Sequence, residues 1–247
     1  MPSKDMTLRE HLEEVRRRLA YVTGAVVLGA ISAFIFRDRI FKFLLDPGFG
    51  RLPETKPVFT EVTEMIGVTM KVSLMMGVIL AIPVVVYHLV MFIAPGLTKR
   101  EKVYLFILLP GTLLVFALGA AFGYYVLFPQ AFKFLFTFGT GNADAFIRIG
   151  SYMNVITMLL FWMGLIFEIP IVMFILARLG VTSPKFLSRF RRYALIMAFV
   201  LGALITPTMD PINQTLVALP VVILYEIGIV LARIGFRLRG QRPSESK

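Results

Sequence analysis

Cysteine is absent from the 247-residue sequence, and charged side chains are scarce. The lack of cysteine excludes disulfide bonds and thiolate chemistry within the chain. Charged residues make up only 17% of the sequence and apolar residues 57%, whereas a soluble domain of this length would need more polar surface. The composition therefore indicates an integral membrane protein.

Long uncharged runs are the local reason for this assignment, because about 20 apolar residues are needed for one helical crossing of a bilayer. Three such runs are Leu19–Phe36, Val72–Thr98 and Ile149–Phe167. The stretch from Val103 to Ile147 is too long for one crossing. Proline and glycine near residues 129–141 predict that its helix ends around Phe128, with an extramembrane segment to about Gly150.

The C-terminal apolar region, Tyr193 to Ala232, is also too long for one crossing and carries only Asp210 and Glu226 as charges. The segment "TPTMDPINQ" (Thr206–Gln214) interrupts it, since its prolines favour a turn. We therefore predict an all-α integral membrane protein in which the fifth and sixth transmembrane helices are short. The six expected helices span about 19–37, 66–94, 103–127, 151–177, 193–207 and 213–232.

Lysine and arginine are distributed unequally between the two sides of this topology. Eighteen of them fall on the side that holds both termini and eight on the other. The excess places both termini in the cytoplasm and accounts for the net charge of +11 without nucleic-acid binding. We expect one membrane domain, with an amphipathic N-terminal helix (1–18), a six-helix core (19–232) and a basic tail (233–247). No cleavable signal is expected, because acids interrupt the N-terminal bases.

The acids on this basic side carry more information than the bases. In "HLEEVRRRL" (His11–Leu19), Glu14 stands four residues before Arg18 on a helix whose apolar stripe follows 3–4 residue spacing. Glu14 is either part of an ordinary helical ion pair or a ligand-binding carboxylate. Glu101 in "FIAPGLTKREK" (Phe92–Lys102) is either a capping-box residue paired with Thr98 or a second binding carboxylate. Two such carboxylates suit a ligand with paired guanidinium groups.

Four motifs occur in order along the chain: "HLEEVRRRL", "FIAPGLTKREK", "FEIP" (Phe167–Pro170) and "TPTMDPINQ". With their spacing, they resemble the TatC family, the multi-spanning receptor of the twin-arginine protein translocase. The resemblance implies six tilted helices in a concave, cup-like shape. It also implies recognition of twin-arginine signal peptides on folded cargo, with transport driven by the proton gradient.

The resemblance also implies roles for single residues. Glu14 and Glu101 would face the paired arginines, and Phe92 is similar to the aromatic residue of the recognition site. Pro47 matches a structural proline near the first external loop. Asp210 and Gln214 match a polar turn that contacts a partner helix.

Glu168 in "FEIP" matches the intramembrane acid of the family. An ionisable group inside the membrane is costly and is a functional candidate, and Pro170 should kink its helix. The opposing interpretation is a protonated, buried acid with a hydrogen-bond partner. A small secondary transporter or channel that uses intramembrane acids is the alternative function. An enzyme is not expected, since no serine nucleophile motif, aspartate pair or histidine metal pair is present, and no cofactor or metal is expected.

The partners that the resemblance implies are signal peptides, single-span TatA-like and TatB-like subunits, and other copies of the chain. The lipid bilayer surrounds the assembly, which would lie in the cytoplasmic (inner) membrane of a prokaryote.

Overall fold

The chain is mainly helical in the residues that the structure describes. The computed structural model describes residues 8–50, 57–93, 99–139, 146–206 and 210–240, with side chains for 12–50, 57–88, 110–135, 146–206 and 210–238. The β structure within these ranges is one parallel bridge between Val58 and Arg148. In chain order the elements are α1 (Leu8–Ile35), α2 (Arg37–Phe49), α3 (Glu64–Ile93), α4 (Lys99–Phe122), the π-helical turn η2 (Gly123–Leu127), α5 (Phe128–Gly139), α6 (Ile149–Phe167), α7 (Ile169–Leu179), α8 (Pro184–Arg189), α9 (Arg191–Ile205) and α10 (Pro211–Gly240).

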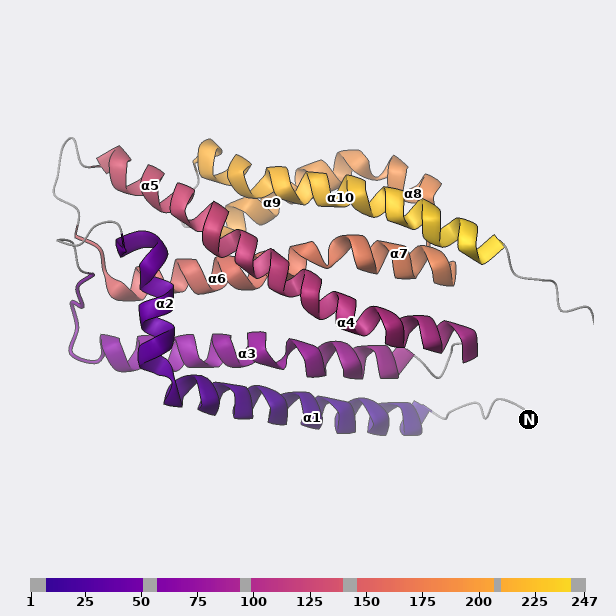
Figure 1. Cartoon of the computed structure of the whole chain (residues 1–247), viewed down its shortest axis with the longest axis horizontal. Coiled ribbons are helices and arrows are strands. Elements are labelled where there is room, and N and C mark those ends of the chain that lie inside the picture. Colours follow the sequence, from indigo (N-terminus) through magenta and orange to yellow (C-terminus); the bar gives the residue numbers. More distant parts are fainter. Residues whose placement is uncertain (1–7, 51–56, 94–98, 140–145, 207–209, 241–247) are drawn as a thin grey trace, which may run out of the picture.

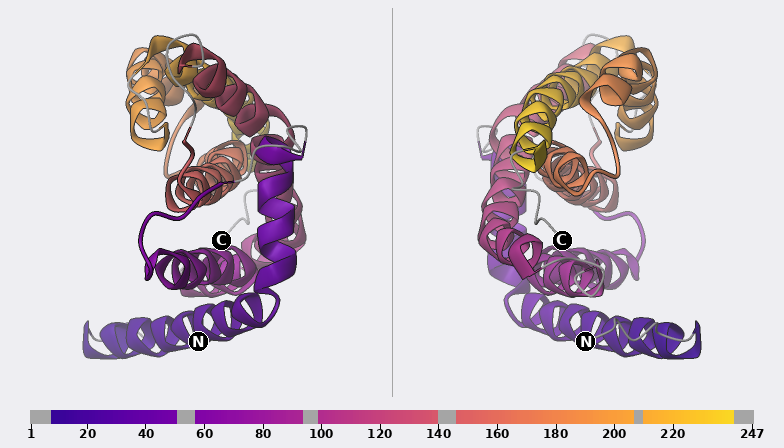
Figure 2. Two further views of the ribbon diagram at one scale, coloured as in Figure 1. Left: turned by 90° about the vertical axis from the view of Figure 1, so that its left-hand side faces the viewer. Right: turned by 90° about the vertical axis from the view of Figure 1, so that its right-hand side faces the viewer.

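The long helices run roughly side by side, while α2 crosses them at one end (Figure 1). The start of α1 and the end of α10 are both at the opposite end of the molecule, on different edges of it (Figure 1). Figure 2 looks along the helices and shows them following an open arc from α1 at one edge to α9 and α10 at the other. This arrangement agrees with the expected all-α fold and its concave shape.

Five helical segments of the described chain are long and apolar enough to cross a membrane. They are Leu12–Ile35, Glu64–His88, Pro110–Leu135, Ile149–Leu179 and Pro211–Leu238. The predicted fifth span corresponds to α9, which has 15 residues and is therefore about 22 Å long, shorter than a hydrocarbon core of about 30 Å. The fifth helix is thus short, as predicted.

The predicted end of the third helix near Phe128 is wrong, because helical structure continues from α4 through η2 into α5. At the end of η2 the N–H of Phe128 donates to the carbonyl of Gly123, five residues earlier. This wide turn lies directly before Pro129, whose ring would clash with the backbone one turn back in a regular α-helix. The proline therefore follows a π-helical turn instead of ending the helix.

Two other boundaries differ from the predictions. The helix α2 was not predicted; its charged residues lie among apolar ones that form a buried face including Leu44. The sixth helix is longer than predicted, because α10 has 30 residues and continues to Gly240 while packing along α7. The expected domain boundaries after residues 18 and 232 fall inside the continuous helices α1 and α10. Residues 1–7 and 241–247 lie outside the described chain.

Pro47 lies inside α2, one turn after Phe43. Since proline has no N–H, it cannot donate a hydrogen bond to the Phe43 carbonyl. The hydroxyl of Tyr124 donates to that carbonyl instead, at 2.6 Å, and the Tyr124 and Phe43 rings stack at 4.2 Å. The hydroxyl of Tyr152, on α6, donates to the carbonyl of Leu44 at 2.8 Å. Two tyrosines therefore fasten α2 to η2 and α6, and one of them uses the acceptor that Pro47 leaves open.

Tyr124→Phe is expected to lower the free energy of unfolding by about 1–2 kcal/mol, because the Phe43 carbonyl loses its hydroxyl donor. The melting temperature of the purified protein in detergent measures this loss. Tyr125→Phe is the matched control, since the Tyr125 side chain is 71% exposed. Equal melting temperatures for the two variants would contradict this account of α2.

Candidate functional site

Glu14 forms an ion pair with Arg18 one turn further along α1. The two side chains are only 14% and 17% exposed, and the Arg18 guanidinium also reaches the carbonyl of His88 on α3, at 3.5 Å. The ring of His88 stacks on Tyr21 of α1 at 5.4 Å. The helical ion pair is therefore present, and it also joins α1 to the last turns of α3.

The same pair leaves part of the Glu14 carboxylate available. Arg18 Nε and a terminal guanidinium nitrogen both donate to Oε1 of Glu14. Within the described side chains, no hydrogen bond to Oε2 is formed. A cationic ligand could therefore bind Glu14 without first breaking its contact with Arg18, so the structural and binding interpretations are compatible.

Phe92 and Glu101 lie at the same end of the molecule as Glu14, as far as the backbone places them. Phe92 is in the last turn of α3, one turn beyond His88, and Glu101 is in the first turn of α4. Both helix ends lie at the end where α1 starts (Figure 1). The side chains of Phe92 and Glu101, and the whole of Thr98, lie outside the described residues, so the capping and binding interpretations of Glu101 both stay predictions.

Glu168 marks a break between α6 and α7, as the prediction of a kink at Pro170 requires. Pro170 stands in the first turn of α7 and cannot donate to the carbonyl one turn back. Glu168 is half-buried, and its Oε1 is buried without a hydrogen-bond partner among the described residues. An acid of this kind inside a candidate membrane span needs water, a proton or a partner group to compensate its burial.

The polar turn before α10 is used within the chain. Asp210 caps α10, because its carboxylate accepts hydrogen bonds from the backbone N–H (2.8 Å) and the side-chain amide (3.0 Å) of Asn213. The Gln214 amide crosses to α9 and donates to the carbonyl of Phe199 at 2.7 Å. Gln214 was expected to reach a helix of a partner protein. In this structure its amide reaches a neighbouring helix of the same chain.

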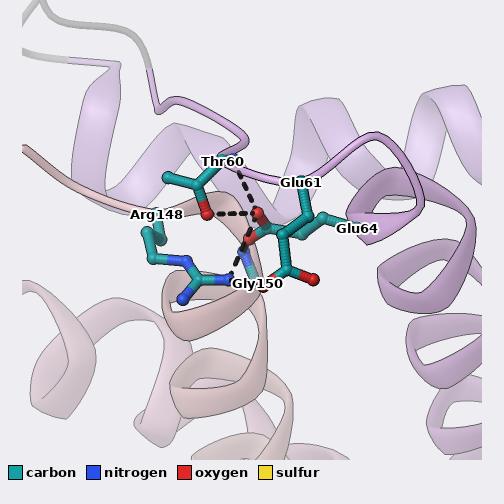
Figure 3. A network of polar contacts seen from close by, with 5 residues as sticks. All are labelled: Thr60, Glu61, Glu64, Arg148 and Gly150. Atoms are coloured by element: carbon teal, nitrogen blue, oxygen red, sulfur yellow. Dashed lines mark hydrogen bonds and ion pairs between the residues drawn. The ribbon is translucent and has the colours of Figure 1, made fainter.

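A polar network at the end opposite the termini was missed from the sequence. Glu64, at the start of α3, has a side chain only 6% exposed. Its carboxylate accepts hydrogen bonds from the N–H (2.8 Å) and hydroxyl (3.1 Å) of Thr60 and from the N–H of Gly150 (3.2 Å), and it lies 3.4 Å from the Arg148 guanidinium (Figure 3). The network joins the starts of α3 and α6. The sequence pattern that could have predicted this network is an acid at the start of one apolar span, Glu64, and an arginine at the start of another, Arg148.

Glu64→Gln is expected to lower the melting temperature by about 5 °C, because an amide has one acceptor oxygen where the carboxylate has two, and no charge for Arg148. Glu61→Gln is the matched control. Glu61 is 68% exposed and lies 3.6 Å from the same guanidinium, so its removal should change the melting temperature far less. An equal loss for both variants would contradict the role of the buried carboxylate.

Comparison with known proteins places these features in a family. The family model described as "Sec-independent protein translocase protein (TatC)" matches residues 10–220. The chain belongs to the TatC family. It is 37% identical to the TatC protein of Carboxydothermus hydrogenoformans over 94% of this chain and 95% of that protein. It is 38% identical to the TatC protein of Aquifex aeolicus over 94% of this chain and 97% of that protein.

A solved structure is similar over nearly the same length. The crystal structure of a twin-arginine translocase receptor, TatC, superimposes with a TM-score of 0.83 at 37% identity, covering 92% of this chain and 99% of that one. The resemblance inferred from four motifs is therefore confirmed, as is the multi-pass membrane fold. TatC proteins are protein translocase components. Because the chain belongs to this family, the expectation that it is not an enzyme is confirmed. The roles predicted for single residues stay predictions.

Proposed function

We propose that this protein is the signal-peptide receptor of a twin-arginine translocase, exporting folded cargo across the cytoplasmic membrane of a prokaryote. The observation that carries the proposal is the similarity over 92% of the chain to a solved twin-arginine translocase receptor. The environment of Glu14 also supports the proposal. Its carboxylate is largely shielded from solvent, and Oε2 has no partner among the described residues, so it is suited to bind a guanidinium.

The proposed binding site consists of Glu14 on α1, Phe92 at the end of α3 and Glu101 at the start of α4. Both termini and this site would face the cytoplasm, because the excess of lysine and arginine lies on their side of the membrane. With α9 as a sixth crossing, the chain returns to the side on which it began. The α1 start and the α10 end are at the same end of the molecule, which supports that count (Figure 1).

The proposed recognition is by charge and shape. One arginine of the peptide would donate two parallel hydrogen bonds to Glu101, which a lysine ammonium cannot do in the same geometry. The other arginine would bind Glu14 through Oε2, because Oε1 already accepts from Arg18. The apolar part of the signal peptide would then lie along the concave face of the helices. Single-span TatA-like and TatB-like subunits and further copies of the chain would assemble beside α9 and α10. The proton gradient would supply the energy for transport.

Binding of two peptides to the purified protein in lipid nanodiscs tests the proposal. One peptide carries Arg-Arg and the other, otherwise identical, carries Lys-Lys. We expect the Arg-Arg peptide to bind about tenfold more tightly, because it keeps the charge-assisted fork geometry. Equal dissociation constants would reject twin-arginine recognition.

The alternative, a small transporter or channel, rests on the buried acid Glu168 within a candidate span. It predicts that the chain alone, in sealed liposomes, moves protons or small cations down an imposed gradient. The receptor proposal predicts no flux above that of protein-free liposomes. Flux that disappears in Glu168→Gln would favour the alternative.

A further inference from the structure

A cationic cavity lies between the short helix α8 and the second half of α10. Its volume is about 620 Å³, and its lining includes Lys185, Arg233 and Arg237 together with the hydroxyls of Ser183 and Ser188. The hydroxyl of Tyr225 on α10 donates to the carbonyl of Leu187 at 2.9 Å, which holds α8 against α10. The cavity is therefore formed by two elements with a defined contact.

The three cations of this cavity are not neutralised by the described chain. Lys185, Arg233 and Arg237 form no ion pair within the described residues, and no acid is among the side chains that line the cavity. The nearby acid Glu226 is already used, since it pairs with Arg191 of α9 at 2.8 Å. Concentrating three like charges is unfavourable unless an anion compensates them. The charge pattern therefore indicates an anionic ligand.

The position of the cavity relative to the membrane-spanning segments indicates the source of that anion. The apolar segments Ile149–Leu179 and Pro211–Leu238 both end beside it. Exposed aromatic side chains lie on α8, at the start of α9 and on the second half of α10, namely Phe186, Phe190, Tyr193 and Phe236. Aromatic side chains and cations with long apolar stems gather where the hydrocarbon core meets the phospholipid headgroups. The cavity is thus placed at the level of lipid phosphates.

We propose that this cavity is a binding site for the headgroup of an anionic phospholipid. Arg233 and Arg237 bind the phosphate through their guanidinium groups, and Lys185 adds a third positive charge. Ser183 accepts a hydrogen bond from the N–H of Phe186 at 3.2 Å, so its hydroxyl hydrogen is free to point to a phosphate oxygen. The acyl chains extend past Phe236 into the bilayer. The site is independent of signal-peptide recognition.

Lipid binding to the full chain in detergent tests the proposal, with native mass spectrometry as the readout. Cardiolipin and phosphatidylglycerol are the anionic probes, and phosphatidylcholine is the zwitterionic control. The double variant Arg233→Gln/Arg237→Gln is expected to bind the anionic probes about thirtyfold more weakly, because each interfacial cation contributes roughly a factor of five. Arg189→Gln is the matched control, since Arg189 is an exposed cation of α8 outside the cavity. Its affinity should stay within about twofold of the unaltered protein.

Three results would overturn the proposal. The first is an equal loss in the double variant and in Arg189→Gln, which would reduce the effect to general surface charge. The second is competition by glycerol 3-phosphate as strong as that by intact lipid, which would assign the site to a free phosphate. The third is displacement of lipid by an acidic peptide at lower concentration than by cardiolipin. Lys185→Gln, on the exposed side of α8, gives a second readout if the double variant folds poorly, and is expected to weaken binding about fivefold.

Discussion

Export by the Glu168→Ala variant is expected to fall by about tenfold or more, while its affinity for a twin-arginine peptide stays within about twofold of the unaltered protein. Glu168 lies at the break between α6 and α7, where Pro170 removes a backbone donor. Its buried Oε1 has no partner among the described residues, so the group is available to water or to a polar group of another helix. We attribute to it a role in translocation after the peptide is bound.

Glu168→Gln separates the two properties of this side chain. Glutamine keeps a hydrogen-bonding group at the same place but cannot ionise, so partial export would indicate a hydrogen-bonding role and no export an ionisable role. Export of a folded reporter into inverted membrane vesicles is the measurement, and peptide binding is measured on the same preparations. Loss of peptide binding in Glu168→Ala would contradict the separation of recognition from translocation.

Gly77→Leu is expected to destabilise the protein by about 3 kcal/mol or more and to lower peptide affinity. A Cβ atom at Gly77 would lie 2.5 Å from the backbone nitrogen of Ala30 and 2.8 Å from the carbonyl oxygen of Val26, both on α1. These are backbone atoms, so the two helices would have to separate. Since α1 packs mainly on α3, that separation would also move Glu14 and Arg18 away from the end of α3.

Gly67→Leu is the matched control for this contact. Gly67 lies on the same helix, but a Cβ atom there meets nothing within 4 Å. The control should therefore keep its stability or gain slightly from the higher helix propensity of leucine. Melting temperatures in detergent and peptide dissociation constants are measured for both variants. Similar melting temperatures for Gly77→Leu and Gly67→Leu would show that the close approach of α1 and α3 is not needed.

The positions of the long helices could be predicted because apolar length is a direct requirement of the bilayer. The start of α3 and the break at Glu168 were predicted within a few residues from charge and proline alone. The continuation past Phe128 could not be predicted, because it depends on a π-helical turn that shifts the backbone before Pro129. The extension of α10 to Gly240 could not be predicted either, because it depends on the packing of α10 along α7.

The candidate site could be predicted only in part. Topology brings Glu14, Phe92 and Glu101 to one end of the molecule, since each lies next to a predicted helix end. The contact of Arg18 with the carbonyl of His88 depends on how α1 and α3 pack, which no local pattern encodes. Likewise, the amide of Gln214 was expected to reach a partner helix, and it is tertiary packing that brings it to the Phe199 carbonyl of α9 in this structure.

We propose that Glu14 and Glu101 recognise paired arginines. A double-mutant cycle tests it most directly, with Arg-Arg and Lys-Lys peptides measured against the unaltered protein and the Glu14→Gln/Glu101→Gln variant. Glu13→Gln serves as the control, because Glu13 is an exposed acid on the same helix. We expect the preference for Arg-Arg to fall from about tenfold in the unaltered protein to within about twofold in the double variant, and to persist in the control. An unchanged preference in the double variant would contradict the account.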